Sequence, residues 1–325
     1  MDPKISVILP TFNGASRGYL RETIESVLNQ SFQNNELIII DDGSTDSTKD
    51  MCKQYLRDPR VVYFYQPNGG PANARNAGIK ASSGEFVCFL DDDDIWKPNK
   101  LQRQVDFIRD RLNDVDKWGM VFTWVELIDA QGNIIGYRGH HEEGSIYKIL
   151  FYEYTIDATS SVLIKREVFN KVGLFDESFR NCQDWDMWLR IAKEYLIFPI
   201  KEYLVQHREH TNRISANNEK VFFYEKAVLE KALSDAPPDV CPVDVFASCY
   251  LNRSVAFFAS QEYHQFRRLL FLGAKLSPKL VKIEHVFLLL LSFSGTKTVN
   301  FVKTMKRYLH NRMLDYRFRN RPLEK

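Results

Sequence analysis

The first hundred residues alternate short apolar runs with amphipathic segments, and this alternation constrains the fold more than any other feature of the chain. The apolar runs cover residues 5–9, 37–40, 61–65 and 85–90. Parallel strands that are covered on both faces form continuous β-branched runs, as residues 37–40 do, and the intervening segments carry apolar residues at helical spacing. We therefore predict an α/β fold with a mostly parallel, Rossmann-like sheet.

The remaining segments predict further strands and helices. We expect a helix along residues 101–112, a strand pair at 118–128 and 133–137, a strand at 160–164, a helix at 184–194 and a strand at 196–205. From about residue 219 onward, leucine and phenylalanine recur at helical intervals. We expect a catalytic domain over residues 1–217 and a C-terminal all-helical extension over residues 218–325, in which residues 252–278 fit a helical hairpin.

The composition excludes several classes of protein. Of the 325 residues, 44% are hydrophobic, which excludes global disorder, and the net charge of +2 creates no overall field that would attract nucleic acid. The five cysteines are scattered without a CxxC pair, as is typical of reduced cytosolic thiols. Residues 1–10 have no basic leader, no long apolar core and no small-residue cleavage site, so we expect no secretion. The longest uncharged apolar stretch, residues 286–296, is shorter than the ~20 residues that a spanning helix needs. We expect a cytoplasmic protein, with any membrane contact peripheral and at the inner face.

Polar residues follow three of the predicted strands. In an open α/β sheet, ligands bind beyond the carboxyl ends of the strands. Pro10, Thr11 and Asn13 come after the first strand, Asp41 after the second, and residues 91–94, four consecutive aspartates, after the fourth. This placement predicts an acidic site at one edge of the sheet.

The four aspartates are costly to hold together. Unit charges about 5 Å apart repel by roughly 3 kcal/mol at an effective dielectric near 20, so a positive charge must compensate. Carboxylate oxygens select hard cations such as Mg²⁺ or Mn²⁺, which also bind substrate phosphates. Strand alternation points Asp91 and Asp93 to the same side and turns Asp92 away. A metal-bound diphosphate is the simplest ligand, and a solvated acidic turn is the alternative.

Four ordered motifs carry a resemblance to a known family. They are VILPTFN at residues 7–13, IIDDGSTD at 39–46, NARNAG at 73–78 and FLDDDDIW at 89–96. Together with GLFDE at 173–177 and QDWDMWLR at 183–190, this pattern resembles the family 2 glycosyltransferases with the GT-A fold, over roughly residues 4–215. The resemblance implies inverting transfer of a sugar from a nucleoside diphosphate, usually uridine diphosphate, onto an acceptor hydroxyl.

The resemblance also implies roles for individual residues. The nucleotide-sugar-binding set is Pro10, Thr11, Asn13, Asp41, Asn73, Arg75, Asp91 and Asp92. Asp91 and Asp93 match the DxD motif, so the implied metal ligands, for Mn²⁺ or Mg²⁺, are Asp93, Asp91 and His210, the last fitting better than His207. Asp184 matches the general base, and Gln183 stands where the family usually has a glutamate, so a second carboxylate role there is in doubt.

The residues themselves support a base at Asp184. Attack by a sugar hydroxyl requires a group that accepts its proton. Because Asp184 opens a predicted helix, the amide dipoles favour its ionised form. The alternative is that Asp184 is an N-cap, which is compatible with the same role.

Other functions and partners remain to be weighed. A dinucleotide-binding oxidoreductase would carry GxGxxG after the first strand, and neither that motif nor a P-loop is present. A nucleotidyltransferase and a non-catalytic nucleotide-sugar-binding or scaffold protein are the alternatives. The expected acceptor is a glycan or lipid-linked glycan of the cell surface. Apolar residues 287–293 and the basic residues between 303 and 321 fit peripheral contact with anionic lipid, or else a buried helix with a solvated basic face.

Overall fold

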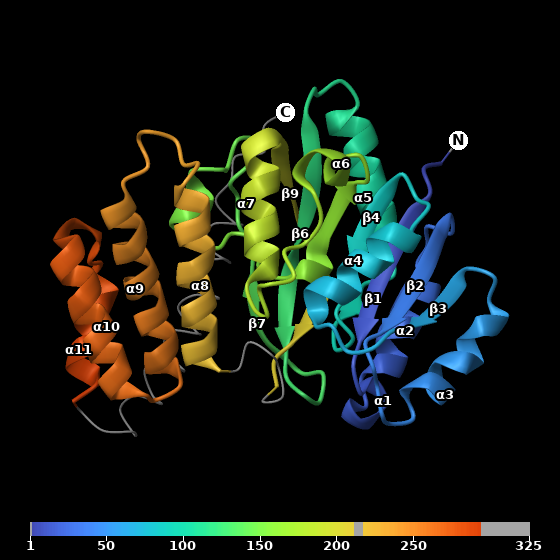
Figure 1. Cartoon of the computed structure of the whole chain (residues 1–325), viewed down its shortest axis with the longest axis horizontal. Helices are drawn as coiled ribbons and strands as arrows, with labels where there is room; N and C mark the ends of the chain where they lie inside the picture. The colour runs from blue at the N-terminus through green and yellow to red at the C-terminus, as the bar shows by residue number, and fades with distance from the viewer. Residues whose placement is uncertain (1, 211–216, 294–325) are drawn as a thin grey trace. The chain divides into compact units, whose positions relative to one another are not determined.

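The computed structural model describes residues 2–210 and 217–293, and its strands form one mixed sheet (Figure 1). The strands are β1 (Ile5–Thr11), β2 (Asn35–Asp41), β3 (Val61–Tyr65), β4 (Phe86–Phe89), β5 (Ile95–Trp96), β6 (Trp118–Ile128), β7 (Ile134–Arg138), β8 (Val162–Lys165) and β9 (Leu196–Arg208). Their order is β3-β2-β1-β4-β8-β6-β9-β5, and β7 pairs with β6. The first four strands run parallel, β8 enters antiparallel to β4, and β6 pairs parallel with β9. The predicted α/β class with a mostly parallel sheet is confirmed.

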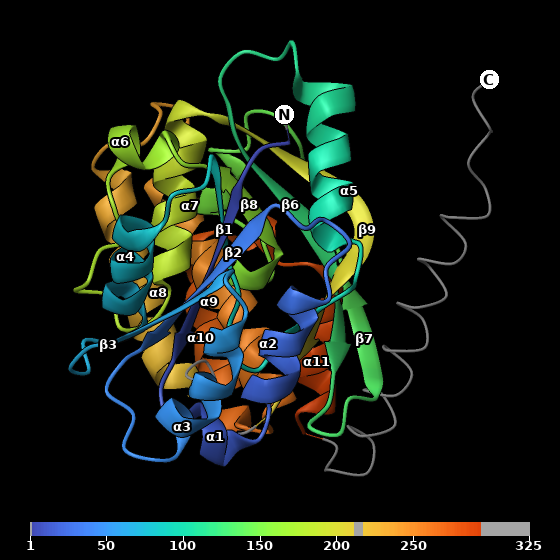
Figure 2. The ribbon, with the colours of Figure 1, turned by 90° about the vertical axis from the view of Figure 1, so that its right-hand side faces the viewer.

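Helices cover both faces of this sheet (Figure 2). They are α1 (Gly14–Arg17), α2 (Leu20–Leu28), α3 (Thr48–Lys53), α4 (Pro71–Ala81), α5 (Lys100–Phe107), α6 (Val168–Val172), α7 (Gln183–Glu194) and α8 (Asn218–Leu233). On β1, Val7 and Leu9 share a core cluster with residues of α2 and α5. Ile8 points to the other face, where a Cβ added at Gly78 of α4 would lie 2.3 Å from its Cγ2 atom. Glycine therefore allows α4 to pack closely against β1.

The chain forms two compact units, with the boundary after Asp235. The first unit contains the sheet and α1 to α8. The second, from Ala236 onward, contains α9 (Pro242–Ala259), α10 (Tyr263–Leu276) and α11 (Ile283–Leu291). The prediction of a helical C-terminal part is confirmed over the described residues 218–293, and the domain boundary at residue 217 stays a prediction. Helices α9 and α10 form a hairpin within the second unit, through a turn in which Gln261 has φ 64°.

Some predicted elements differ from the observed ones. The strand expected at 160–164 begins at Val162, because residues Thr159–Ser161 form a short 3-10 turn, η4. The basic residues between 303 and 321 lie outside the described residues. Among the helices that the structure describes, none combines the length and the apolar character that crossing a membrane requires.

Candidate active site

The carboxyl ends of β1, β2 and β4 meet at one edge of the sheet. Strand β1 lies between β2 and β4, so the strand order reverses there, and Thr11 pairs in register with Asp41. Asn13 adopts a left-handed conformation with φ 52°. Its amide donates to Ser44 Oγ at 2.8 Å, and its Oδ1 accepts from the Thr45 amide at 2.8 Å. The loops after β1 and β2 are therefore joined, and Pro10 and Asn13 lie in the predicted region.

Asp41 is fully buried at the end of β2. Its Oδ1 accepts from the Ser44 amide at 2.8 Å, and its Oδ2 accepts from the Tyr63 hydroxyl at 2.5 Å. Burial and the hydrogen bond to Asp41 raise the pKa of Tyr63, so its phenol stays protonated and donates. The sequence reasoning missed Tyr63, although its position on the neighbouring strand was a usable signal.

The loop before α4 is held by side-chain acceptors. Asp42 accepts from the amides of Gly69 at 2.9 Å and Gly70 at 2.7 Å. Asn73, predicted to face the nucleotide, donates to Glu177 Oε2 at 2.9 Å, and Asn76 donates to Glu177 Oε1 at 2.9 Å. In the structure, Asn73 thus links α4 to the segment after α6, and its contact with a nucleotide stays a prediction.

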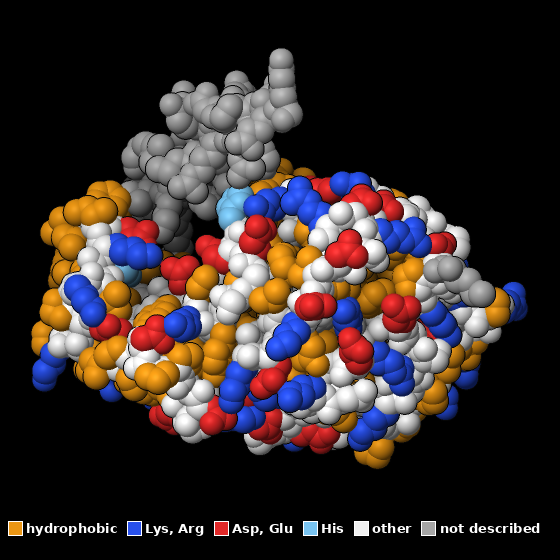
Figure 3. Space-filling model, turned by 90° about the horizontal axis from the view of Figure 1, so that it is seen from above, with side chains coloured by type: hydrophobic (Ala, Val, Ile, Leu, Met, Phe, Trp, Pro, Cys, Tyr) orange, Lys and Arg blue, Asp and Glu red, His pale blue; other side chains and the backbone are white. Residues whose placement is uncertain are grey.

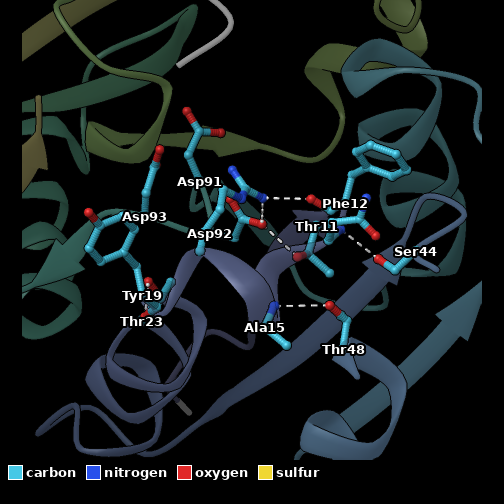
Figure 4. A network of polar contacts seen from close by, with 12 residues as sticks. Thr11, Phe12, Ala15, Tyr19, Thr23, Ser44, Thr48, Asp91, Asp92 and Asp93 are labelled. Carbon is cyan, nitrogen blue, oxygen red and sulfur yellow. Dashed lines mark hydrogen bonds and ion pairs between the residues drawn. The ribbon is translucent and has the colours of Figure 1, made fainter. Parts of the chain in front are cut away.

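Asp91 and Asp93 point to the same side, as predicted, although both lie in the turn that follows β4 and not in the strand itself (Figure 4). Asp91 Oδ1 accepts from Arg75 at 2.5 Å, and Asp93 Oδ2 lies 2.8 Å from His210 Nε2. Arg75 is 4% exposed, and its Nε and Nη1 atoms are buried without a hydrogen-bond partner among the described residues. Such orphaned donors are rare in proteins, so this part of the edge has unused capacity to bind an anion.

Asp92 turns toward β1, where the chain supplies its partners (Figure 4). Its Oδ2 accepts from Thr11 Oγ1 at 2.5 Å and from Arg17. Burial raises the pKa of Asp92 to about 7, and Asp93 and Asp91 add to the shift against the opposing effect of Arg17. Arginines therefore provide part of the positive charge that the sequence argument assigned to a cation.

Asp94, the last of the four, is fully buried. It accepts from Ser160 Oγ at 2.5 Å and from the Arg208 amide at 3.0 Å, and its carboxylate lies 3.0 Å from His207 Nδ1. These contacts join the end of β4 to η4 and to the end of β9. His207 thus contacts Asp94, whereas His210 contacts Asp93.

Asp184 lies in the first turn of α7. The N-cap of this helix is Cys182, with φ 58°, so the interpretation of Asp184 as an N-cap is wrong. Asp184 Oδ2 accepts from the Tyr154 hydroxyl at 2.7 Å and from Thr159 Oγ1 at 3.2 Å. Burial and the charge of Asp184 raise the pKa of Tyr154, which keeps its phenol a hydrogen-bond donor.

The η4 turn connects the carboxylate of Asp184 with the aspartates after β4. Thr159 donates to Asp184, and the adjacent Ser160 donates to Asp94 and accepts from the Asp91 amide at 3.1 Å. The indole of Trp96 donates to the Ser160 carbonyl at 2.8 Å. This turn was predicted as the start of a strand, so the sequence reasoning missed Thr159 and Ser160 as site residues.

The residues around Asp93 fit a divalent cation in part. The Asp93 oxygen and the His210 nitrogen lie 2.8 Å apart, close to the roughly 3 Å between neighbouring ligands of an octahedral ion with bonds of about 2.1 Å. No group of three or more His, Cys, Asp or Glu side chains in the described part of the chain is arranged to hold a metal ion. Two protein ligands suit an ion that completes its shell with water and substrate phosphate.

Comparison with known proteins identifies the class that this fold and site define. Residues 6–173, more than half of the chain, match the family model described as "Glycosyl transferase family 2". The chain therefore belongs to glycosyl transferase family 2, and the predicted enzyme class is confirmed.

Individual relatives of the chain are named as glycosyltransferases too. TuaG, a putative teichuronic acid biosynthesis glycosyltransferase of Bacillus subtilis, is 34% identical over 221 residues, which are 67% of this chain and 84% of that protein. The glycosyltransferase GlyG of Streptococcus pneumoniae is 28% identical over 82% of this chain and 91% of that protein. An uncharacterized glycosyltransferase of Rickettsia typhi is 33% identical over 64% of each chain, and the match spans 38% of a relative from Rickettsia bellii.

Solved structures confirm the predicted GT-A fold. S. aureus TarS, residues 1–349, superposes with a TM-score of 0.59 at 19% identity, covering 85% of this chain and 81% of that one. The mannosyltransferase PcManGT of Pyrobaculum calidifontis superposes with a TM-score of 0.60 at 18% identity, covering 99% of this chain and 89% of that one. At these identities the similarity establishes the fold alone.

Proposed function

We propose that this chain transfers a sugar from a nucleoside diphosphate to an acceptor hydroxyl, with inversion at the anomeric carbon. The observation that carries the proposal is the pair of neighbouring residues in η4. Thr159 contacts Asp184 and Ser160 contacts Asp94, so a candidate base and the acidic strand end share one short turn. A transferase needs both a proton acceptor and a diphosphate site close to the reacting carbon.

The donor is proposed to be a uridine diphosphate sugar. The carboxylate of Asp41 has acceptor capacity beyond its bonds from Ser44 and Tyr63, which suits the N–H group of a pyrimidine base. The buried free nitrogens of Arg75 suit a phosphate oxygen. TarS has been solved with UDP-GlcNAc and PcManGT with GDP-Man and Mn²⁺, so carriers with either base occur on this fold.

In the proposed reaction, the acceptor oxygen bonds to the anomeric carbon on the face opposite the leaving group. The bond from that carbon to the diphosphate oxygen breaks, and the acceptor proton passes to the carboxylate of Asp184. Tyr154 and Thr159 hold this carboxylate in place through hydrogen bonds. The acceptor is proposed to be a cell-surface glycan or its lipid-linked form.

A divalent cation, Mn²⁺ or Mg²⁺, is proposed to bind at Asp93 and His210, with Asp91 beside them. When bound, it supplies positive charge that stabilises a departing diphosphate. On the protein side, Arg75 orients Asp91 and leaves two donors for the phosphates. The negative charge of the diphosphate would thus be shared between the cation and the buried Arg75.

Thermal unfolding with a panel of nucleoside diphosphates, with and without Mn²⁺, tests the proposal. A ligand at about 100 times its dissociation constant stabilises by roughly 2.7 kcal/mol, which moves the midpoint by several degrees. We expect uridine diphosphate to act in a metal-dependent way on the wild type and on Asp114→Ala, a control at an exposed acid, and not on Asp93→Ala. A shift by another nucleotide would correct the donor.

Product analysis separates the remaining alternatives. Release of a nucleoside diphosphate from a sugar nucleotide supports the transferase, whereas release of pyrophosphate from a nucleoside triphosphate and a sugar phosphate identifies a nucleotidyltransferase. If no nucleotide shifts the midpoint under any condition, the chain is a non-catalytic scaffold.

A further inference from the structure

Helix α11 carries an apolar face that the structure leaves exposed. The residues of this α11 stripe are Ile283, Val286, Phe287, Leu290 and Phe293, with exposed fractions of 84%, 45%, 51%, 67% and 71%. Their spacing of three and four residues places them on one side of the helix. An exposed stripe of large apolar side chains marks an interaction surface.

The α11 stripe is a second apolar face, distinct from the one that holds the helix to its own unit. His285, Leu288 and Leu291 are 2%, 4% and 8% exposed, and α11 contacts α9. A helix that packs on one side and faces water on the other ordinarily has a polar outer face. Because α11 is apolar on both sides, folding of the second unit alone does not account for its sequence.

Basic side chains accompany the stripe. The Arg267 guanidinium lies 4.8 Å from the centre of the Phe293 ring and donates to the Ser292 carbonyl at 3.2 Å. The exposed charged residues between positions 263 and 293 are Arg268, Lys275, Lys279, Lys282 and Glu284. Hydrophobic side chains with lysine and arginine among them gather at the left-hand end of Figure 3.

Positive and negative charges are unevenly distributed along the sequence. Residues 236–325 hold 15 Lys and Arg against six Asp and Glu, a formal charge of +9, whereas residues 1–235 hold 29 against 36, a charge of −7. The small net charge of the whole chain is therefore the sum of a negative charge on residues 1–235 and a positive charge on residues 236–325. Of this positive charge, residues 294–325, which lie outside the described residues, hold nine Lys and Arg against two Asp and Glu, and residues 236–293 hold six against four. A basic sequence next to an exposed apolar stripe is complementary to an anionic lipid surface.

We propose that the α11 stripe inserts into the interface of an anionic bilayer, with the exposed lysines and arginine of residues 263–293 at the headgroups. Helix α11, with its nine residues, is too short to span a membrane, and its apolar side chains fit the depth of the headgroup boundary. The aromatic rings of Phe287 and Phe293 add apolar surface area at that depth. The inference is independent of the proposed transfer reaction, since lipid binding needs neither donor nor acceptor.

Co-sedimentation of the full chain with extruded vesicles tests this proposal. We expect binding to vesicles of phosphatidylcholine mixed with phosphatidylglycerol, weaker binding to phosphatidylcholine alone, and loss of binding in high salt. Phe287→Ser combined with Leu290→Ser is expected to lower the partition coefficient about tenfold or more, since apolar area drives insertion. Phe223→Ser is the matched control, because Phe223 is 62% exposed in the first unit.

Several outcomes would overturn the proposal. They are absence of vesicle binding by the wild type, equal binding by the double variant, and an equal loss in Phe223→Ser. A dimer in light scattering that dissociates in the double variant would assign the stripe to a second copy. The milder Ile283→Gln, at the most exposed position, keeps the test valid if the double variant fails to fold, with folding checked by thermal unfolding.

Discussion

The two halves of the first unit place their functional residues differently. In the half built from β1 to β4, the candidate donor-binding residues lie at the strand ends, since Thr11 and Asp41 are the last residues of β1 and β2 and Asp91 comes shortly after β4. In the half built from β6 to β9, Tyr154 and Thr159 lie in the connection before β8 and Asp184 lies at the start of α7. The first half positions its side chains by the sheet, and the second positions them by contacts between loops.

The two halves also differ in the hydrogen-bond partners of their carboxylates. In the first half, Asp91 and Asp92 form ion pairs with Arg75 and Arg17, although burial raises the pKa of Asp92 to about 7. In the described residues, the donors that hold Asp184 are the Tyr154 and Thr159 hydroxyls and the Trp185 amide, all neutral. The candidate donor-binding carboxylates are thus held by charged partners and the candidate base by neutral ones, which agrees with the separate roles proposed for the two halves.

The largest effect is expected for Asp184→Asn. Because an amide cannot accept the acceptor proton, we expect the transfer rate to fall by about 10³-fold. Because donor binding is proposed to use residues of the other half, the thermal shift by the nucleoside diphosphate should persist. Measuring both quantities on one preparation checks the division of labour, and a variant that loses both would show that the halves are not separable.

The site residues of the first half could be predicted from the sequence, whereas those of the second half could be predicted only in part. The prediction that Asp91 and Asp93 lie on one side, away from Asp92, assumed the alternation of a strand. The orientation is as predicted, but its cause is a turn after β4, in which the Asp94 amide donates to the Asp91 carbonyl at 3.1 Å. The roles of Tyr154 and Thr159 depend on the path of residues 139–158, which have no periodicity that predicts their position. The same absence of pattern explains why η4 was taken for the start of β8.

The second largest effect is expected for Asp94→Ala, which removes several of the contacts between the halves. This change leaves the Ser160 hydroxyl without its acceptor and removes the contact of Asp94 with His207. We expect a loss of about 3 kcal/mol of unfolding free energy, measured by chemical denaturation. Asp50→Ala, at a side chain that is 76% exposed, is the control and should change stability little. Equal stability of both variants would contradict a bridging role.

A smaller effect concerns Lys100 on α5, which contacts the Gln104 side chain at 3.0 Å. Gln104 in turn donates to the Ser161 carbonyl of η4 at 3.2 Å. Burial lowers the pKa of Lys100 to about 8 from 10.5, so between these values the unfolded chain binds more protons and stability rises with pH.

The Lys100→Met variant tests this titration. It should be more stable than the wild type at pH 7, by on the order of 2 kcal/mol, because it removes a buried charge. The difference should shrink as the pH rises from 8 to 10, where the folded wild type also loses the proton. Chemical denaturation at each pH measures the difference, and a gap that is constant with pH would show that Lys100 does not titrate as proposed.

The smallest effect is expected for Tyr154→Phe, which keeps the ring against Trp185, at a centroid distance of 5.7 Å, and removes the hydroxyl that donates to Asp184. A hydrogen bond to a charged group contributes about 1.5 kcal/mol, so the transfer rate should fall about tenfold. The ionised carboxylate also loses a donor, so the acid limb of the pH–rate profile should move to higher pH. A merely structural role would leave that limb in place. Tyr147→Phe, at an exposed hydroxyl of the same connection, is the control and should change neither quantity. If Tyr154→Phe lowers the rate without moving the acid limb, the hydroxyl contacts the substrate and does not position the base.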